Sequence, residues 1–188
     1  PYTTLFRSTS VQDIPLKRID GGADTLAAHK GKVLLIVNVA SKCGLTPQYA
    51  GLEKLFADKR GAGLEVLGFP ANNFLGQEPG SDAEIADFCQ STYAVDFPMY
   101  SKISVAGDDQ HPLYAALIAA QPKATGEGPF RERLAGKNLG GAAPGILWNF
   151  EKFVVGRNGE VVARFSPDVA ADDPRLVSVL EAELAKPA

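Results

Sequence analysis

The sequence predicts an α/β protein in which helices cover both faces of a mixed central β-sheet. Two apolar runs, Lys32 to Val39 and Leu64 to Phe69, have the length and uniform hydrophobicity of strands buried on both faces. Between these runs, apolar residues recur at helical spacing. This predicts a strand-helix-strand unit, whose strands are parallel and whose crossover is right-handed. Near the carboxyl end, Arg157-Asn158-Gly159 carries the strongest short signal for a β-hairpin, which adds antiparallel strands.

The amino-terminal half begins with a half-exposed strand. Apolar and polar residues alternate from Ile14 to Ile19, before the turn signal Asp20-Gly21-Gly22. After the first buried strand, apolar residues recur at helical spacing along 49–56, and we expect Gly61 to end that helix. A loop from Pro70 to Gly80 follows the second buried strand.

A second helix, a strand and a third helix come next. Ser81-Asp82-Ala83-Glu84 has the spacing of a capping box, and the residues at 85, 88, 89 and 92 share one face of the helix that it begins. We expect a strand over Met99 to Val105 and a helix over His111 to Ala120.

The last third contains a long connection, the hairpin and a closing helix. Gln121 to Gly145 is rich in Gly and Pro, and its only helical indication is Phe130 to Leu134. The hairpin strands are expected at Phe153 to Val155 and Glu160 to Phe165, and Asp173-Pro174 begins the final helix. This order of elements is typical of a thioredoxin-like fold.

Length and composition exclude several classes of protein. The chain has 188 residues, of which 45% are hydrophobic and 22% charged, enough for one core. A net charge of −3 gives no electrostatic footprint for nucleic acid or an anionic membrane. No apolar stretch approaches the ~20 residues of a transmembrane helix, so we expect no membrane association. Two cysteines are too few for a disulfide framework, and no export leader is recognisable, so the cytoplasm is the expected compartment.

The first eight residues, Pro1 to Ser8, resemble the translation of a sequencing adapter rather than a natural amino terminus. We leave them out of the fold. Residues 9–188 are then expected to form a single domain, without internal repeats or an interdomain linker.

Cys43 follows the first buried strand, at the point where a helix is expected to begin. Free backbone N–H groups at a helix start favour an anion, and Lys42 adds a positive charge, so this placement indicates thiolate chemistry. The alternative is a small buried apolar residue, because free cysteine is among the most buried residue types.

Three loops carry the unusual residues and are expected near the carboxyl ends of strands, where α/β sheets place their ligands. They are Ala40 to Thr46, Phe69 to Gly80 and Leu147 to Phe153. Their sequence blocks, in order along the chain and together with two shorter ones, are NVASKCG, GFPANNFLGQEPGS, FPM, HPLY and WNFEKFVV. These blocks resemble those of the glutathione peroxidases, in the form that uses cysteine rather than selenocysteine. The resemblance extends from about Val11 to the carboxyl terminus.

The resemblance implies roles for four residues. Cys43 matches the peroxidatic residue, which attacks a peroxide oxygen as thiolate and becomes a sulfenic acid. Gln77, Trp148 and Asn149 match the other members of a tetrad, whose amide and indole donors hold the anion and the developing alkoxide. Without the resemblance, Trp148 is most simply a core aromatic, and the two amides are ordinary loop residues.

Cys89 matches the resolving cysteine of the thioredoxin-dependent branch of that family. By helical spacing alone it is a core residue on the inner face of its helix. Because a disulfide needs Cα atoms within ~7 Å, a resolving role requires this helix to open locally.

The sequence also departs from the family at three positions. Ala71 stands where many relatives have a further cysteine, Asn73 replaces a usual glutamine, and Leu75 replaces a usual glycine. The last two affect the loop that carries Gln77. The length of 121–145 leaves the oligomeric state open, because the shortest, monomeric members have a near-direct connection there.

The expected function is a thiol peroxidase that reduces hydrogen peroxide and organic or lipid hydroperoxides, with thioredoxin or glutathione as reductant. No prosthetic cofactor is implied. A zinc site is not expected, because neither cysteine has a partner at ligand spacing, and His29 and His111 look like surface residues. One alternative is a peroxide sensor that passes its oxidation to a partner protein. A weaker one is a disulfide exchanger, against which the missing C-x-x-C argues.

Overall fold

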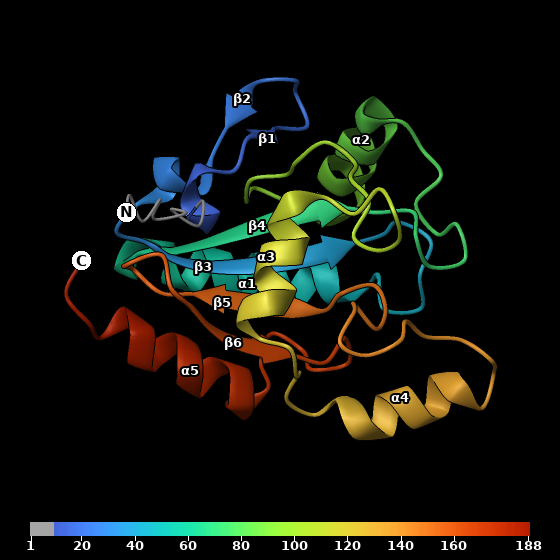
Figure 1. Cartoon of the computed structure of the whole chain (residues 1–188). Helices are drawn as coiled ribbons and strands as arrows, with labels where there is room; N and C mark the ends of the chain where they lie inside the picture. The colour runs from blue at the N-terminus through green and yellow to red at the C-terminus, as the bar shows by residue number, and fades with distance from the viewer. Residues whose placement is uncertain (1–9) are drawn as a thin grey trace, which may run out of the picture.

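A four-stranded mixed sheet lies at the centre of the molecule, in the order β4-β3-β5-β6 (Figure 1). In this computed structural model, which describes residues 10–188, β3 (Val33–Val39) and β4 (Leu64–Pro70) are parallel. β5 (Lys152–Val155) runs antiparallel to β3, and β6 (Val161–Phe165) runs antiparallel to β5. The predicted α/β fold with a mixed sheet is confirmed. The adapter interpretation of Pro1 to Ser8 lies outside the described residues.

Helices cover both faces of this sheet, as the sequence predicted. One face packs against α1 (Gln48–Lys59), α2 (Asp82–Tyr93) and α5 (Pro174–Leu184). The other packs against α3 (Pro112–Ala120) and α4 (Glu127–Ala135). Figure 1 shows α3 in front of the sheet and α1 behind it. Within residues 10–188, no helix combines the length and apolar character needed to cross a membrane.

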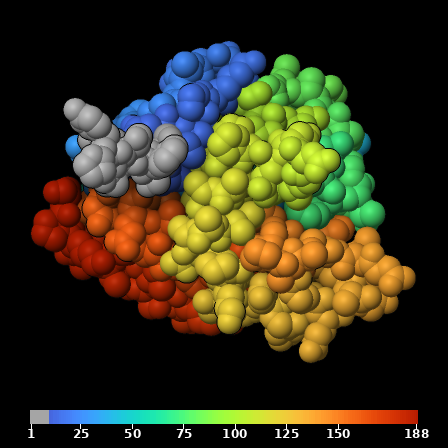
Figure 2. Space-filling model, in the orientation of Figure 1, coloured from blue at the N-terminus to red at the C-terminus, as the bar shows by residue number. Residues whose placement is uncertain are grey.

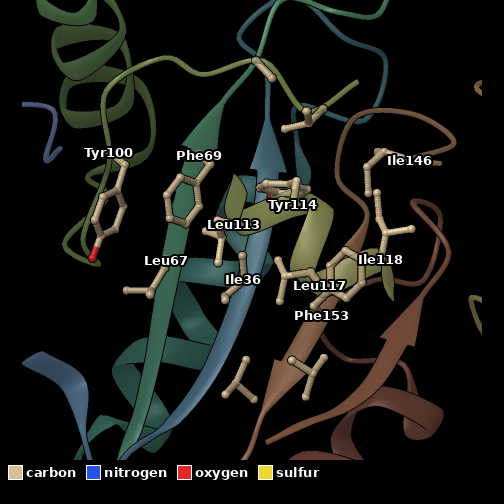
Figure 3. Packing of buried hydrophobic residues seen from close by; sticks show 14 of the residues in the cluster. Ile36, Leu67, Phe69, Tyr100, Leu113, Tyr114, Leu117, Ile118, Ile146 and Phe153 are labelled. Atoms are coloured by element: carbon tan, nitrogen blue, oxygen red, sulfur yellow. The ribbon is translucent and has the colours of Figure 1, made fainter. Parts of the chain in front are cut away.

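The two faces of the sheet alternate along each strand and form two separate cores. Ile36 of β3 and Phe153 of β5 face α3, whose Leu113 and Leu117 pack over them (Figure 3). Their strand neighbours Leu35 and Val154 face α1 and α5 instead. Both faces of β3 are therefore apolar, which explains the uninterrupted hydrophobic run in the sequence.

The helix boundaries follow their capping residues. α2 begins with a complete capping box in which Ser81 and Glu84 bond each other's backbone N–H groups. The Asp173 side chain caps α5. The end of α1 was placed wrongly, because a 3-10 turn, η3 (Arg60–Ala62), continues it and the left-handed residue is Gly63, with φ +110°, rather than Gly61.

One predicted strand is shorter than expected and another is not a strand. The opening strand is only β1 (Leu16–Lys17), which pairs with β2 (Ala23–Asp24) in a small separate sheet flanked by η1 (Val11–Asp13) and η2 (Leu26–His29). The predicted strand over Met99 to Val105 is wrong. That segment is extended, but it makes only isolated bridges, to Gly68 of β4, to Ala71 directly after β4 and, on its other side, to Arg18.

The connection from 121 to 145 contains a helix, α4, which is longer than the indicated Phe130 to Leu134. Pro129 obscures its start in the sequence. Proline is tolerated there because the N–H groups of a first helical turn have no intrahelical acceptor. In the space-filling view, this segment forms a lobe at the lower right of the molecule (Figure 2). Phe130 and Leu134 attach the lobe to the core.

His29 is not the surface residue that the sequence suggested. Its Nε2 lies 3.1 Å from a carboxylate oxygen of Asp24, and its Nδ1 lies 3.6 Å from one of Glu65 at the start of β4. Tyr100 donates to the same Asp24 oxygen, and Lys32 pairs with Glu65. The hydrogen bond with Glu65 raises the pKa of His29, against the effect of burial. This group fastens the amino-terminal sheet to the central one.

Candidate active site

Three loops meet at one edge of the central sheet. The loops after β3 and β4 lie side by side because these strands are parallel and Val39 is opposite Pro70. The third loop precedes β5. It reaches the same edge because β5 is antiparallel to β3, with Lys152 opposite Val37. All three predicted loops are therefore brought together.

Cys43 lies in a tight turn before α1, not at the first residues of the helix, which begins at Gln48. Its sulfur accepts a hydrogen bond from the Leu45 backbone N–H at 3.3 Å. Its own N–H donates to the Thr46 hydroxyl at 3.0 Å, and that hydroxyl donates to the Ala40 carbonyl at 2.8 Å. The turn thus presents a half-buried thiol next to a backbone donor.

Gln77 and Asn149 are in direct contact. The Asn149 side-chain nitrogen donates to the Gln77 side-chain oxygen at 2.9 Å. The Gln77 backbone carbonyl accepts from the N–H of Lys42, the neighbour of Cys43, at 3.0 Å. Because its side-chain oxygen is engaged, the Gln77 amide has its NH₂ group left as the free end.

Trp148 is 7% exposed and packs against Phe74, with ring centroids 5.3 Å apart. Its backbone carbonyl accepts from the Asn38 side chain at 3.1 Å, which ties its loop to β3. A second hydrogen bond joins the loop to the same residue of β3: the Phe150 N–H donates to the Asn38 backbone carbonyl at 2.6 Å. Phe150 has a left-handed backbone, with φ +69°, an unusual conformation for a bulky residue that is held here by its surroundings.

The loop that carries Gln77 is firmly held in spite of its departures from the family. Asn73 accepts from the Val105 N–H at 2.9 Å and donates to the Ser104 hydroxyl at 3.0 Å. Leu75 has φ +55°, the left-handed region in which glycine is favoured. Its side chain points away from the core and is 65% exposed.

Glu78, to which the sequence assigned no role, is buried at this edge and 1% exposed. One carboxylate oxygen accepts the Ser41 N–H at 3.2 Å, and the other is buried without a partner. Burial raises the pKa of this carboxyl, against the hydrogen bond with Ser41 and the charge of Lys102. In the sequence, the only signal for Glu78 is an acidic residue next to Gln77, three positions before the capping box begins at Ser81.

Cys89 is 2% exposed on the inner face of α2, beside Ile85, as its helical spacing predicted. It and Cys43 are both free thiols. Burial raises the pKa of the Cys89 thiol, the Tyr49 hydroxyl lowers it, and the charge of Glu78 raises it further. The structure therefore does not bring the two cysteines together in a disulfide.

A buried lysine lies beneath the start of α1. The ammonium group of Lys152 donates to the Gln48 side chain at 2.6 Å and to the Pro167 carbonyl at 2.8 Å. Burial lowers its pKa to about 7. Directly before β5, Glu151 forms a buried ion pair with Arg164 at 2.7 Å. Within the part of the chain that the structure describes, no cluster of three His, Cys, Asp or Glu side chains could hold a metal ion.

Residues 11–118 of the chain match the family model described as Glutathione peroxidase. A protein of Escherichia coli (strain K12) named Thioredoxin/glutathione peroxidase BtuE is 52% identical over 180 residues, which cover 94% of this chain and 98% of that protein. The family model covers the loops that carry Cys43 and Gln77 and ends before the loop that carries Trp148 and Asn149.

Solved structures agree with this assignment. The crystal structure of Trgpx in apo form superimposes with a TM-score of 0.69 at 32% identity, covering 96% of this chain and 99% of that one. A thioredoxin family protein of Chlorobium tepidum, at 13% identity and a TM-score of 0.59, shares the fold alone. The fold is thioredoxin-like, and this chain belongs to the glutathione peroxidase family and is a peroxidase, an oxidoreductase that acts on peroxides.

Proposed function

We propose that this peroxidase reduces hydrogen peroxide and organic or lipid hydroperoxides through a sulfenic acid at Cys43. The observation that carries the proposal is the meeting of the Cys43 turn with the hydrogen-bonded pair Gln77 and Asn149 at one edge of the sheet. A thiol that is half-buried and accepts a backbone hydrogen bond is accessible to a small peroxide.

In the first step the Cys43 thiolate attacks one peroxide oxygen and the O–O bond breaks. The leaving oxygen departs as an alkoxide or hydroxide and takes up a proton. The free NH₂ end of Gln77 and the indole N–H of Trp148 supply uncharged donors for these anions. Because both groups are fixed by packing and hydrogen bonds, they need little reorganisation during the reaction.

In the second step Cys89 attacks the Cys43 sulfenic acid, and water leaves as the disulfide forms. The inner-face position of Cys89 in α2 requires the helix to open between Ile85 and Tyr93. The capping box and the contacts of Asp82 with Ser101 and Lys102 hold the first turn, so we expect the opening to begin in the later turns.

A dithiol reductant such as thioredoxin then restores both thiols, with glutathione as the alternative. The name of the Escherichia coli relative mentions both reductants, which supports this pair of candidates. Thioredoxin is preferred here because a protein disulfide is its usual type of substrate and the chain carries a second cysteine at a matching position.

The direct test is hydrogen peroxide turnover by the purified protein, followed as NADPH consumption with either thioredoxin and its reductase or glutathione and its reductase. Turnover with thioredoxin is expected, and Cys43→Ser should abolish it while the melting temperature stays near that of wild type. Appreciable turnover by pure Cys43→Ser protein would overturn the role of Cys43.

The same assay distinguishes a peroxide sensor from a peroxidase that turns over. A sensor consumes one equivalent of peroxide and then stops, because it needs its own protein client to become reduced. Continuous consumption with thioredoxin contradicts a sensor that acts only through a client.

A further inference from the structure

The buried Glu78 carboxyl lies between the two segments that carry the cysteines. Its Oε1 accepts the N–H of Ser41 at 3.2 Å, two residues before Cys43. Its backbone is fixed on both sides, because its N–H donates to the Asn72 side chain and its carbonyl accepts from Lys102, both at 2.9 Å. The carboxyl therefore has a defined position at the edge of the active site.

A hollow of about 400 Å³ separates the Cys43 turn from α2, and Glu78 lines it together with Ile85 and Phe88 of that helix. The Oε2 atom of Glu78 is fully buried and has no hydrogen-bond partner among the described residues. Its charge is close enough to Cys89 to raise the pKa of that thiol. A buried carboxylate oxygen without a donor is costly, and this one is free to take up a proton.

We propose that Glu78 is the proton acceptor for Cys89 in the step that forms the Cys43–Cys89 disulfide. This inference rests on the proposed function, because it concerns the resolution of the Cys43 sulfenic acid. It assigns to Glu78 no part in the attack on peroxide.

The step balances without a further reactant. The Cys89 thiol gives its proton to the Glu78 carboxylate, and the resulting thiolate attacks the Cys43 sulfur. The S–O bond of the sulfenic acid breaks as the S–S bond forms, so that the Cys43 sulfur is reduced and the Cys89 sulfur is oxidised. The departing hydroxide takes the proton from Glu78 and leaves as water, which returns Glu78 to its carboxylate form.

Other charged and titratable groups near Glu78 are less suited to this role. Glu84, the second carboxyl that lines the hollow, is exposed and caps α2. The hydroxyl of Tyr49 stays protonated, because burial raises its pKa well above the ordinary value. Lys42 and Lys102 lie on the same side and are cations. The raised pKa of Glu78 makes its carboxylate a stronger base than an exposed one.

The test separates the two steps in single-turnover experiments on the full chain. Peroxide is mixed with reduced protein, and samples are quenched with a thiol-alkylating reagent at set times. Mass spectrometry then gives the amounts of sulfenic acid and disulfide. Glu78→Gln keeps the shape and the acceptor for Ser41 but cannot take a proton. We expect the second-order reaction with peroxide to stay within a few-fold of wild type and disulfide formation to be slower by roughly 10². Glu84→Gln is the matched control and should resolve at the wild-type rate.

The pH dependence gives a readout that a purely structural role of Glu78 does not move. In wild type, disulfide formation should accelerate as pH rises through the pKa of Glu78 and then level off. In Glu78→Gln it should keep rising into the alkaline range of the thiol, because hydroxide must remove the proton. A wild-type profile that is flat through the acid range, or a Glu78→Gln variant that resolves like wild type, would overturn the inference. If no sulfenic acid forms on wild-type Cys43, the proposed function itself fails instead.

Discussion

The Asn149 side chain donates a 2.9 Å hydrogen bond to the side-chain oxygen of Gln77, across 72 positions of sequence. This bond decides which end of the Gln77 amide is available. With the oxygen engaged, the NH₂ group is left to act as a donor, and Asn149 thus positions Gln77 rather than duplicating it. The consequence is that the two residues should behave as a unit in the reaction with peroxide.

We predict that Gln77→Ala lowers the second-order rate constant with hydrogen peroxide by roughly 10², the usual effect of losing one preorganised donor. Asn149→Ala should lower it as well, because Gln77 is then free to turn. The double variant should be little worse than the poorer single one, since contacting residues are not additive. Stopped-flow measurement of the peroxide step provides the numbers. If the double variant lost the product of the two single losses, the two residues would act independently and not as a unit. If all three variants kept rate constants near that of wild type, neither residue would belong to the mechanism.

Trp148→Phe removes one donor and keeps an aromatic ring against Phe74. We predict a loss of roughly 10² in the same rate constant, with a melting temperature close to that of wild type. A variant that unfolds early but retains the wild-type rate constant would identify Trp148 as a core aromatic only.

Oxidation should loosen α2. Because Cys89 is 2% exposed on the inner face, it must leave the core to reach Cys43, and the helix around it must open. One equivalent of peroxide should give a Cys43–Cys89 disulfide by peptide mapping, together with faster hydrogen exchange across Ile85 to Tyr93. Cys89→Ser should still consume one equivalent, lose turnover with thioredoxin and over-oxidise at Cys43 under excess peroxide. Normal turnover of that variant with thioredoxin would return Cys89 to an ordinary core role.

The His29 group should stabilise the protein in mildly acidic solution. The pKa of His29 is raised above 6.5, so the stability gained from its charged form is complete below about that pH and is lost as pH rises through the higher folded value. Burial works against the ionised forms of Asp24 and Glu65, but their hydrogen bonds lower both pKa values, so their contribution is lost only in stronger acid.

His29→Gln should therefore reduce the free energy of unfolding by roughly 1–2 kcal/mol near pH 6 and by less near pH 8, measured by urea denaturation. His111→Asn is the control, because burial lowers the pKa of His111 and its titration has the opposite sign. A His29→Gln effect that grows with pH would contradict the assignment.

Lys152 should affect stability at higher pH. Its folded pKa of about 7 lies below the unfolded value of 10.5, so between these values the unfolded chain binds the additional proton. Wild type should gain stability, relative to Lys152→Met, as pH rises from 7 to 10. If the difference in free energy of unfolding between the two proteins stayed constant from pH 7 to 10, Lys152 would not titrate in this range.

The strongest sequence signals gave the right elements. The capping box placed α2 and Asn158-Gly159 placed the hairpin, because each signal depends on contacts within its own segment. Uniform hydrophobicity placed β3 and β4, because both faces of these strands are buried under helices. The strand predicted over Met99 to Val105 failed because the segment makes only isolated bridges, two at the end of β4 and one to Arg18. Periodicity shows that a segment is extended, but it carries no information on whether a continuous ladder of hydrogen bonds forms.

The candidate site was predictable where it depended on a motif and unpredictable where it depended on tertiary contact. The blocks around Cys43, Gln77 and Trp148 could be located from the sequence, and the structure brings their loops to one edge. The burial of Glu78, whose carboxylate accepts the Ser41 N–H, could not be read from the sequence because it depends on tertiary contact. The donor beside the Cys43 sulfur could not be read either, because it depends on the turn that the Thr46 hydroxyl holds.

The contact between Asn38 and Trp148 joins positions that are 110 residues apart. During synthesis on the ribosome, Cys43 emerges long before Trp148 and Asn149, so the nascent chain carries its thiol without the donors of the third loop. These donors arrive only when β5 pairs with β3. Peroxidase activity should therefore appear late, after nearly the whole chain has been made, and no amino-terminal fragment that stops before β5 should possess it.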